Sequence, residues 1–492
     1  MNKNYILKAI ILFSFIIFCP YREVFGKDIT SDVRGNQSYN TSQQDISVIK
    51  FKDNNLEIGI RKKLNKPKGD ITKGDLGNIV ELTLNHKYIS SLDGIQYLTN
   101  LKKLDLAFNK ISDISPLSSL TNIVNLNLGY NQIENISILS NLIDLQELNL
   151  QSNKISNISA LKNLINLKIL SLYYNNLTDL NPLSGLINLV DLDLYLNKIE
   201  DIKPLRPLVN LTKLSLGMNK ITNVDSLKGL TKLKILELDE NKIIDISPLS
   251  KLTKLNDLYL YGNKIKDVYP LKALTNLINL ELSNNEIINI KGLGKLINLK
   301  TLSLDNNKIN SLKGLGSAIN LESIRVAYNE ISTIEDLSLL KKLNSLNLGN
   351  NKIVDVKPLR LLYKLKSLDI SHNKINDISS LRELPELTLT NIEFSGNPLP
   401  KYVFMDKLNE KYTLSTLSPY IESAIKQYYG EYRLYMNEGI LSIQQVDGDY
   451  KLKIRVVTFV GPHNPPYGIE TITITQDISG IKVEDFKHED EK

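Results

Sequence analysis

The chain has 492 residues, of which 42% are hydrophobic, and this content excludes global disorder. The formal net charge of +6 falls to +4 without residues 1–26, because that segment holds three basic side chains and one acidic side chain. So small a positive excess gives no reason to expect a nucleic-acid partner.

The N-terminal segment has the pattern of an export signal. Lys3 and Lys8 supply positive charge, and the apolar run at 10–19 has ten residues. A membrane-spanning helix needs ~20 residues, so this run is too short to cross a bilayer. We therefore expect residues 1–26 to be a signal peptide and the polar residues 27–45 to be a flexible leader.

Other ways of attaching the chain to a membrane or wall are disfavoured. Lipidation of Cys19, the only cysteine, needs a small residue before it, but Phe18 precedes it and Pro20 follows it. No second apolar stretch of ~18 residues exists, so we expect no membrane span. The sequence at 399–403 is not a cell-wall sorting signal, so we expect no covalent attachment to a wall.

A repeat of 22 residues dominates the rest of the sequence. Its most regular feature is an asparagine that follows a Leu-x-Leu segment by three residues. This asparagine recurs thirteen times at the same spacing, as Asn109, Asn131, Asn153, Asn175, Asn197, Asn219, Asn241, Asn263, Asn285, Asn307, Asn329, Asn351 and Asn373. Asn397 follows after 24 residues, and Lys87 replaces the asparagine in an earlier unit, as expected for end units that lack one neighbour.

The chemistry of the repeat predicts a stacked parallel sheet. Leu104 and Leu106 alternate along a short strand and point into the stack, whereas Asp105 between them points outward onto a concave face. Asn109 turns the chain inward, and its amide can bond backbone groups of adjacent turns that have no other partner. We therefore expect the thirteen asparagines to form a continuous structural ladder.

The return path to the next strand is too short for a full α-helix. Only eight to ten residues remain, and in six units a proline stands three residues after an aspartate. Proline fits the first position of a helical turn, and the aspartate can cap the entry. We expect 3₁₀ turns on the convex side. The prolines are Pro116, Pro182, Pro204, Pro248, Pro270 and Pro358.

The repeat resembles that of the internalins. Residues 113–121 and 245–253 both read Asp-Ile-Ser-Pro-Leu-x-x-Leu-Thr. The resemblance covers 46–397 and implies an α/β solenoid, a right-handed leucine-rich-repeat superhelix. Residues 46–80 resemble the internalin helical cap, and residues 81–398 hold about 15 units. It further implies a bacterial binding protein that is secreted or associated with the cell surface.

The period stops after Asn397, and we expect residues 399–492 to form a small α+β domain. One helical face and four strand-like runs indicate it. The helical face is Leu417, Ile421, Ala424, Ile425 and Tyr428, and the runs are 434–443, 450–460, 468–478 and 481–486.

This segment resembles a domain of unknown function found in exported proteins of spore-forming Gram-positive bacteria. The residues that carry the resemblance are 418–421, 428–430 and 461–468. The loop at 461–468 holds His463 in a Gly/Pro frame. We interpret it as a constrained hairpin loop in preference to a site.

Catalytic constellations are missing from the sequence. His86, His372, His463 and His488 have no metal-ligand neighbour at the expected spacing. No phosphate-cradling glycine loop, complete calcium loop or nucleophile elbow occurs. We expect no enzyme activity, no metal and no cofactor, and an enzyme with its site in 400–492 is the least favoured alternative.

Two columns of the predicted concave face form a candidate binding site. Aromatic and acidic side chains alternate there, which suits a protein ligand of basic character, since tyrosine is enriched at energetic centres of interfaces. The alternative is that the tyrosines pack together to protect the sheet. The candidate residues are Tyr173, Asp193, Tyr195, Glu237, Tyr259, Tyr261, Glu281 and Arg325.

A lysine follows the ladder asparagine in nine of the thirteen units, which raises the alternative of an anionic cell-wall polymer as a partner. We favour a solvated rim for this column. Its members are Lys110, Lys154, Lys198, Lys220, Lys242, Lys264, Lys308, Lys352 and Lys374.

The preferred hypothesis is an exported, non-catalytic and monomeric recognition or adhesion protein that binds a macromolecule on its concave face. Two alternatives remain. One is a wall-associated scaffold that displays the C-terminal domain. The other is an intracellular repeat protein like those that regulate phosphatases, which the signal segment disfavours.

Overall fold

A computed structural model describes most of the chain. The described residues are 47–381, 384–387, 391–399, 417, 419–428, 434–446, 449–459, 468–477 and 480–490. The predicted signal peptide and leader, and the loop that contains His463, lie outside them. In the described part, no helix is both long enough and apolar enough to cross a membrane.

Two short helices precede the repeats, α2 (Asn54–Leu64) and α3 (Lys73–Leu76). Asp53 caps α2, because one of its carboxylate oxygens accepts the backbone N–H groups of Asn55 and Leu56. Its other oxygen accepts the N–H of Ser90 at 2.7 Å, which ties the helix to the first repeat. The helices therefore close one end of the hydrophobic stack, as the sequence predicted.

The repeats form one 15-stranded parallel sheet in sequential order, β1 to β15. The strands are β1 Glu81–Thr83, β2 Lys103–Asp105, β3 Asn125–Asn127, β4 Glu147–Asn149, β5 Ile169–Ser171, β6 Asp191–Asp193, β7 Lys213–Ser215, β8 Ile235–Glu237, β9 Asp257–Tyr259, β10 Asn279–Glu281, β11 Thr301–Ser303, β12 Ser323–Arg325, β13 Ser345–Asn347, β14 Ser367–Asp369 and β15 Ile392–Glu393.

Short 3₁₀ helices lie on the opposite side of each turn, as predicted. They are η1 Ile95–Tyr97, η2 Ser115–Ser119, η3 Ser137–Asn141, η4 Ser159–Leu161, η5 Asn181–Leu183, η6 Lys203–Leu205, η7 Asp225–Gly229, η8 Ser247–Lys251, η9 Tyr269–Ala273, η10 Leu293–Lys295, η11 Leu315–Ser317, η12 Glu335–Leu339, η13 Lys357–Leu361 and η14 Ser379–Leu381.

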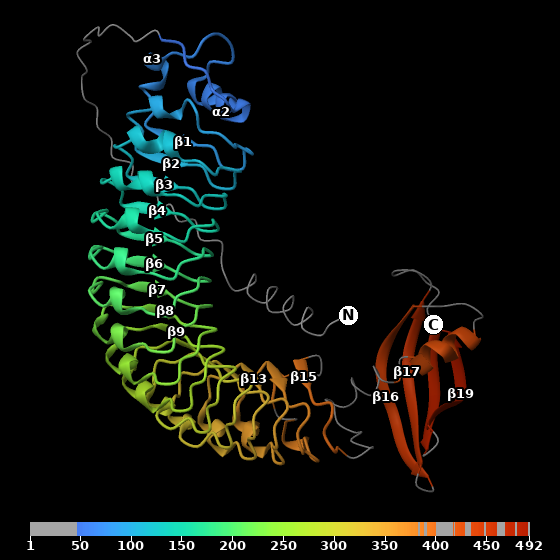
Figure 1. Ribbon diagram of the computed structural model, residues 1–492. Coiled ribbons are helices and arrows are strands. Elements are labelled where there is room, and N and C mark those ends of the chain that lie inside the picture. Colours follow the sequence, from blue (N-terminus) through green and yellow to red (C-terminus); the bar gives the residue numbers. More distant parts are fainter. Residues whose placement is uncertain are drawn as a thin grey trace, which may run out of the picture. The chain divides into compact units, whose positions relative to one another are not determined.

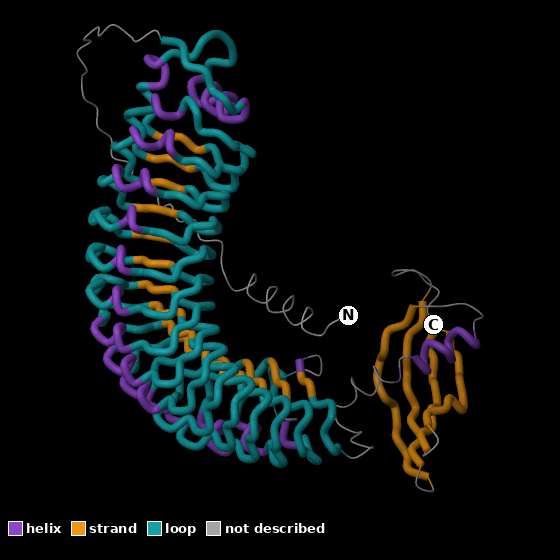
Figure 2. The backbone as a smooth tube through the Cα atoms, viewed as in Figure 1, coloured by secondary structure: helices purple, strands orange, loops and turns teal. Residues whose placement is uncertain are grey.

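The repeat array is curved, with strands on its inner side and 3₁₀ turns on its outer side (Figures 1 and 2). Strands pair 22 residues apart, so that Leu104 lies beside Leu126, and the last pair, Leu368 with Ile392, is 24 residues apart. Leu104 is 1% exposed and Leu106 is fully buried. The leucines therefore form the predicted continuous core, and the sheet's other face carries the side chains between them.

The entry to most of the described outer turns is fixed by a polar side chain, with or without a proline. Asp113 accepts the backbone N–H of Ser115 at 2.8 Å in a unit that has the proline. Asn135 accepts that of Ser137 at 2.9 Å in a unit that lacks it. The predicted role of the aspartate is thus observed, and the turn depends on this hydrogen bond more than on proline.

The C-terminal segment contains a four-stranded antiparallel sheet of β16 (Leu434–Val446), β17 (Asp449–Phe459), β18 (Gly468–Asp477) and β19 (Gly480–Asp490). A helix covers residues 419–428. The predicted helix and four strands are therefore confirmed. The apolar face of the helix packs with the sheet in a core of its own, made of Leu417, Ile421, Ala424, Ile425, Ile454, Val456, Ile472 and Ile474.

Candidate binding face

The concave face presents aromatic and acidic side chains in register. Tyr259 on β9 lies directly between Glu237 on β8 and Glu281 on β10. Asp193 on β6 is separated from Glu237 by Ser215 on β7. Because all of these side chains occupy the position between two buried leucines, they project from the inner side of the sheet.

The four predicted tyrosines fall into two groups. The rings of Tyr173 and Tyr195, on consecutive turns, have centroids 5.9 Å apart. The ring of Tyr195 lies over Gly217, where an added Cβ would come within 2.2 Å of its Cε2 atom. A larger residue at 217 would displace this ring, so glycine sets its position. Tyr259 and Tyr261 belong to a turn further along the array.

Asp239 holds the second group in place. One of its oxygens accepts the backbone N–H of Tyr261 at 2.9 Å, and the residue is only 5% exposed. Asp193 makes a related contact and accepts the N–H of Tyr195 at 3.1 Å. Asp193 and Asp239 therefore orient the backbone that carries the tyrosines. The place of Asp239 in the repeat did not predict its hydrogen bond to the backbone of Tyr261.

Burial and mutual repulsion weaken the ionisation of these carboxyl groups. Burial is the main reason that the pKa of Asp193 is raised to about 7; the N–H of Tyr195 opposes this rise, and the charge of Glu237 adds to it. Burial is the largest cause that raises the pKa of Asp239 well above its ordinary value, and the negative charge of Glu237 is the second largest. Burial also raises the pKa of Tyr259 to about 12. A cationic ligand group would favour the ionised carboxylates and would therefore be attracted to this face.

Arg325 is set apart from the other candidates. It lies on β12, two strands from Glu281, with Ser303 between them. Its Nη2 atom is 2.7 Å from an oxygen of Asp305. The structure therefore joins Arg325 to Asp305 and does not bring it together with the acidic residues around Tyr259.

All thirteen ladder asparagines make the same set of hydrogen bonds between turns. The Oδ1 atom of Asn219 accepts the N–H of Ile199 at 3.0 Å. Its Nδ2 atom donates to the carbonyl oxygens of Leu194, Leu216 and Gly217, each at 3.0 Å. Each ladder residue thus satisfies backbone groups of its own turn and of the preceding one.

A second asparagine column, missed in the sequence, stands nine residues before the ladder. Its Nδ2 atoms donate to carbonyl oxygens 23 residues earlier, as from Asn188 to Ile165 at 2.9 Å. The sequence signal for this column is an asparagine that recurs at the same 22-residue spacing, nine positions before the ladder asparagine. The members with this bond are Asn100, Asn122, Asn166, Asn188, Asn210, Asn276, Asn298 and Asn320.

The lysine column that follows the ladder is partly neutralised. Lys352 lies 2.8 Å from Glu330, Lys220 lies 3.4 Å from Glu200, and the ammonium of Lys110 is 5.6 Å from the ring centroid of Tyr88. The two glutamates reduce the positive charge that this column offers to an anionic polymer, whereas the neutral ring of Tyr88 leaves the charge of Lys110 in place.

Three of the four histidines lie in the described part of the chain. His86 stacks on Phe108 with ring centroids 4.2 Å apart, and His372 occupies the turn before Asn373. The Nδ1 atom of His488 is 3.1 Å from the buried carboxylate of Glu470. Among the described residues, no group of three or more potential metal ligands occurs.

Family comparisons assign the repeats and the C-terminal segment separately. The family described as "Leucine Rich repeats (2 copies)" matches 77–119, 165–207, 209–251, 231–273 and 275–317, and a single "Leucine Rich repeat" matches 364–378. A protein family of unknown function, DUF3888, matches 410–490. No curated protein matches the chain by sequence.

Solved structures share the architecture of the repeats. An internalin (inlF) from Listeria monocytogenes is 34% identical, with a TM-score of 0.60, over 70% of this chain and 96% of that protein. A leucine-rich-repeat protein from Leptospira interrogans is 26% identical, with a TM-score of 0.61, over 70% and 96%.

The functional domain of InlJ from Listeria monocytogenes, which includes a cysteine ladder, is 21% identical with a TM-score of 0.62. That match covers 88% of this chain and 95% of the InlJ domain and shows a shared fold alone.

Proposed function

The chain belongs to the internalin-like leucine-rich-repeat proteins, and we propose on that premise that it is an exported, non-catalytic protein whose concave face binds a protein ligand. Export rests on the basic and apolar pattern of residues 1–26. An adhesion or recognition role rests on the chemistry of the concave face.

The observation that carries the proposal is the arrangement of tyrosines around acidic residues. Tyr173 and Tyr195 belong to turns that precede β8, the strand that carries Glu237, and Tyr259 and Tyr261 belong to the turn that follows it. Tyrosine offers contact area with little loss of side-chain entropy, and carboxylates between the rings favour a basic patch on the partner. A protein with exposed Lys or Arg among apolar residues fits this face.

The test is capture of partners by the full chain and by a variant with Tyr259→Ser and Tyr261→Ser. A matched control carries Tyr269→Ser and Tyr363→Ser, because these tyrosines are 42% and 52% exposed but lie outside the concave columns. Bound proteins from bacterial envelope and host-cell extracts are quantified by mass spectrometry. We expect the concave variant to lose the specific partner and the control to retain it. Equal retention by both variants would exclude the concave face.

A further inference from the structure

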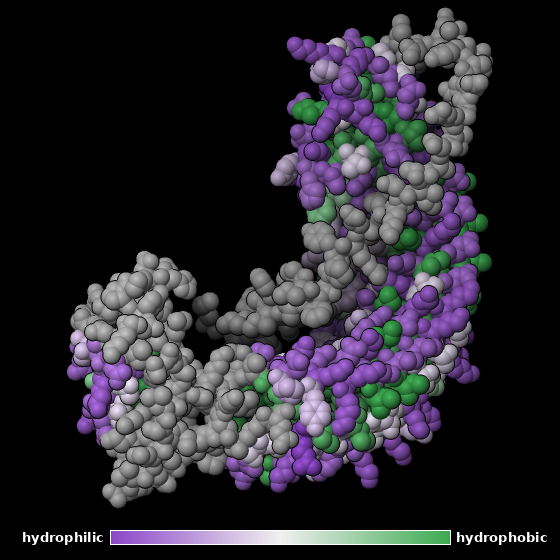
Figure 3. All heavy atoms as spheres, turned by 180° about the vertical axis from the view of Figure 1, so that it is seen from behind, coloured by the Kyte–Doolittle hydropathy of each residue, from purple (hydrophilic) through white to green (hydrophobic). Residues whose placement is uncertain are grey.

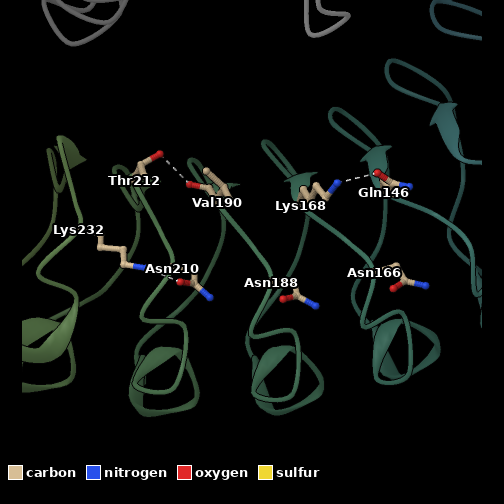
Figure 4. A pocket seen from close by; sticks show the side chains of 8 residues that line it. All are labelled: Gln146, Asn166, Lys168, Asn188, Val190, Asn210, Thr212 and Lys232. Carbon is tan, nitrogen blue, oxygen red and sulfur yellow. Dashed lines mark hydrogen bonds between the residues drawn. The ribbon is translucent and has the colours of Figure 1, made fainter.

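The flank of the repeat array carries a second surface that the concave face does not include. A groove of about 580 Å³ crosses the turns of β4 to β8 just before the strands begin. Figure 4 shows its side chains in two rows, one at the starts of the strands and one nearer the 3₁₀ turns. The lining residues are Gln146, Asn166, Lys168, Asn188, Val190, Asn210, Thr212 and Lys232.

One row of the groove offers hydrogen-bond acceptors at a regular spacing. The Nδ2 atoms of Asn166, Asn188 and Asn210 each donate a hydrogen bond to a backbone carbonyl oxygen of the preceding turn. This bond fixes each amide, so the Oδ1 atoms of Asn166 and Asn188 remain to accept a hydrogen from outside, whereas that of Asn210 accepts the ammonium of Lys232. In this part of the second asparagine column, the Nδ2 atoms therefore hold the backbone, and the Oδ1 atoms that have no partner in the groove can accept a hydrogen bond from a ligand.

Two lysines give the groove a positive charge. Lys168 donates to the amide oxygen of Gln146 at 2.9 Å, and Lys232 donates to that of Asn210 at 2.7 Å (Figure 4). Neither lysine forms an ion pair with a residue in the described part of the chain, and no lining residue is acidic. Neutral partners thus hold both ammonium groups without cancelling their charge, unlike Lys352 of the opposite lysine column.

Exposed aliphatic side chains stand beside the same turns. Beside the groove, the register position immediately before the second asparagine column holds Ile143 (before Asp144), Ile165, Ile187 and Val209, which are 56%, 55%, 51% and 47% exposed. Ile297 and Ile319 occupy the same register further along the array and are 53% and 57% exposed. Five other turns carry threonine in that register, at 99, 121, 231, 253 and 275. Threonine therefore satisfies the fold there, and the four aliphatic residues add exposed apolar surface. Figure 3 shows apolar patches recurring among hydrophilic residues along the array.

We propose that this flank groove binds an extended acidic peptide segment of a partner protein. Backbone N–H groups of the peptide would donate to the Oδ1 atoms of the asparagine row, its carboxylates would bind Lys168 and Lys232, and its apolar side chains would contact Val190 and the exposed aliphatic residues. Because a plain polyanion has no use for the aliphatic residues, charge together with apolar surface favours a peptide.

The spacing of the lysines specifies the peptide further. Lys168 belongs to the turn of β5 and Lys232 to that of β8, three turns away, which at ~4.8 Å per strand is a separation of about 14 Å along the array. An extended chain advances about 3.3 Å per residue, so the two carboxylates should stand roughly four residues apart. The ligand is thus an extended segment with acidic residues at positions i and i+4 and apolar residues between them.

Fluorescence anisotropy with the full chain tests the proposal. The probe is a labelled, end-capped ten-residue peptide with two glutamates four apart and valines between them, and its counterpart carries glutamine in place of glutamate. We expect the Lys168→Gln, Lys232→Gln variant to bind the glutamate peptide at least tenfold more weakly. The Lys154→Gln, Lys198→Gln control removes the same charge from the opposite flank and should change binding less than twofold.

A second pair of variants separates a peptide site from a simple charge site. Ile165→Thr with Ile187→Thr introduces the residue that other turns carry, so folding is retained, and it should weaken peptide binding severalfold. Inorganic polyphosphate serves as a probe without apolar groups. The proposal is overturned if the glutamate peptide fails to bind, if the two lysine variants behave alike, or if polyphosphate competes fully while the threonine variant has no effect. The Tyr259 and Tyr261 substitutions should leave peptide binding unchanged, so this test stands apart from the proposed concave function.

Discussion

Replacing one central ladder asparagine, Asn219→Ala, removes four hydrogen bonds at a site that is 8% exposed. The N–H of Ile199 and three carbonyl oxygens lose their side-chain partner. At about 1 kcal/mol net for each hydrogen bond, the expected loss is roughly 4 kcal/mol. The matched change Asn188→Ala removes one exposed bond and should cost about 0.5 kcal/mol.

Amide hydrogen exchange of the full chain measures this loss where it occurs. A solenoid can open locally because each turn contacts only its neighbours, so a single global unfolding free energy is insufficient. Loss of roughly 4 kcal/mol would accelerate exchange at Ile199 by up to about 10³-fold, since each 1.4 kcal/mol corresponds to a factor of ten. Urea unfolding followed by circular dichroism supplies the comparison across the array.

Similar effects of the two substitutions would contradict a stabilising role for the ladder. Equal urea midpoints for Asn219→Ala and Asn188→Ala, with unchanged exchange at Ile199, would mean that water replaces the ladder bonds at no cost. The ladder would then be a feature of the repeat without being a source of its stability.

Three further predictions concern the concave face and export. Burial raises the pKa of Asp193 from its ordinary 3.8 to about 7, so this carboxyl lowers the stability of the fold progressively from about pH 4 to pH 7 and by a constant amount above pH 7. Asp193→Asn should therefore stabilise by up to about 4 kcal/mol at pH 8 and not at pH 4, as measured by urea unfolding. Gly217→Ala should displace Tyr195 and weaken partner binding at least fivefold in calorimetry, with unchanged circular dichroism, and undiminished binding would show that the ring position is irrelevant. N-terminal sequencing of protein recovered from a bacterial culture medium should start close to residue 27, and an intact residue 1 would contradict export.

The fold could be predicted because every turn repeats the same pattern of leucine and asparagine positions. Leu104 and Asn109 recur at a fixed spacing, and that spacing alone determines strand pairing, the ladder and the length left for a 3₁₀ turn. The observed sheet, outer turns and C-terminal elements follow the predicted ones closely.

Contacts between neighbouring turns could not be predicted from register. Asp239 accepts a hydrogen bond from Tyr261, and Arg325 forms an ion pair with Asp305. Both contacts depend on the direction in which a side chain points across the spacing of about 5 Å to the next strand. The flank groove was missed for a related reason, because it combines residues from two registers whose pattern is weaker than that of the leucines.

Cysteine footprinting tests the central claim that the concave face is the binding surface. Cys19→Ser removes the native thiol, after which Ile235→Cys places a single thiol on β8 beside the acidic residues. Ile244→Cys instead places the thiol in the loop that follows, where Ile244 is 59% exposed. Maleimide labelling is timed with and without the captured partner. We expect at least tenfold slower labelling at 235 and an unchanged rate at 244. Protection at 244 with free labelling at 235 would place the ligand elsewhere and contradict it.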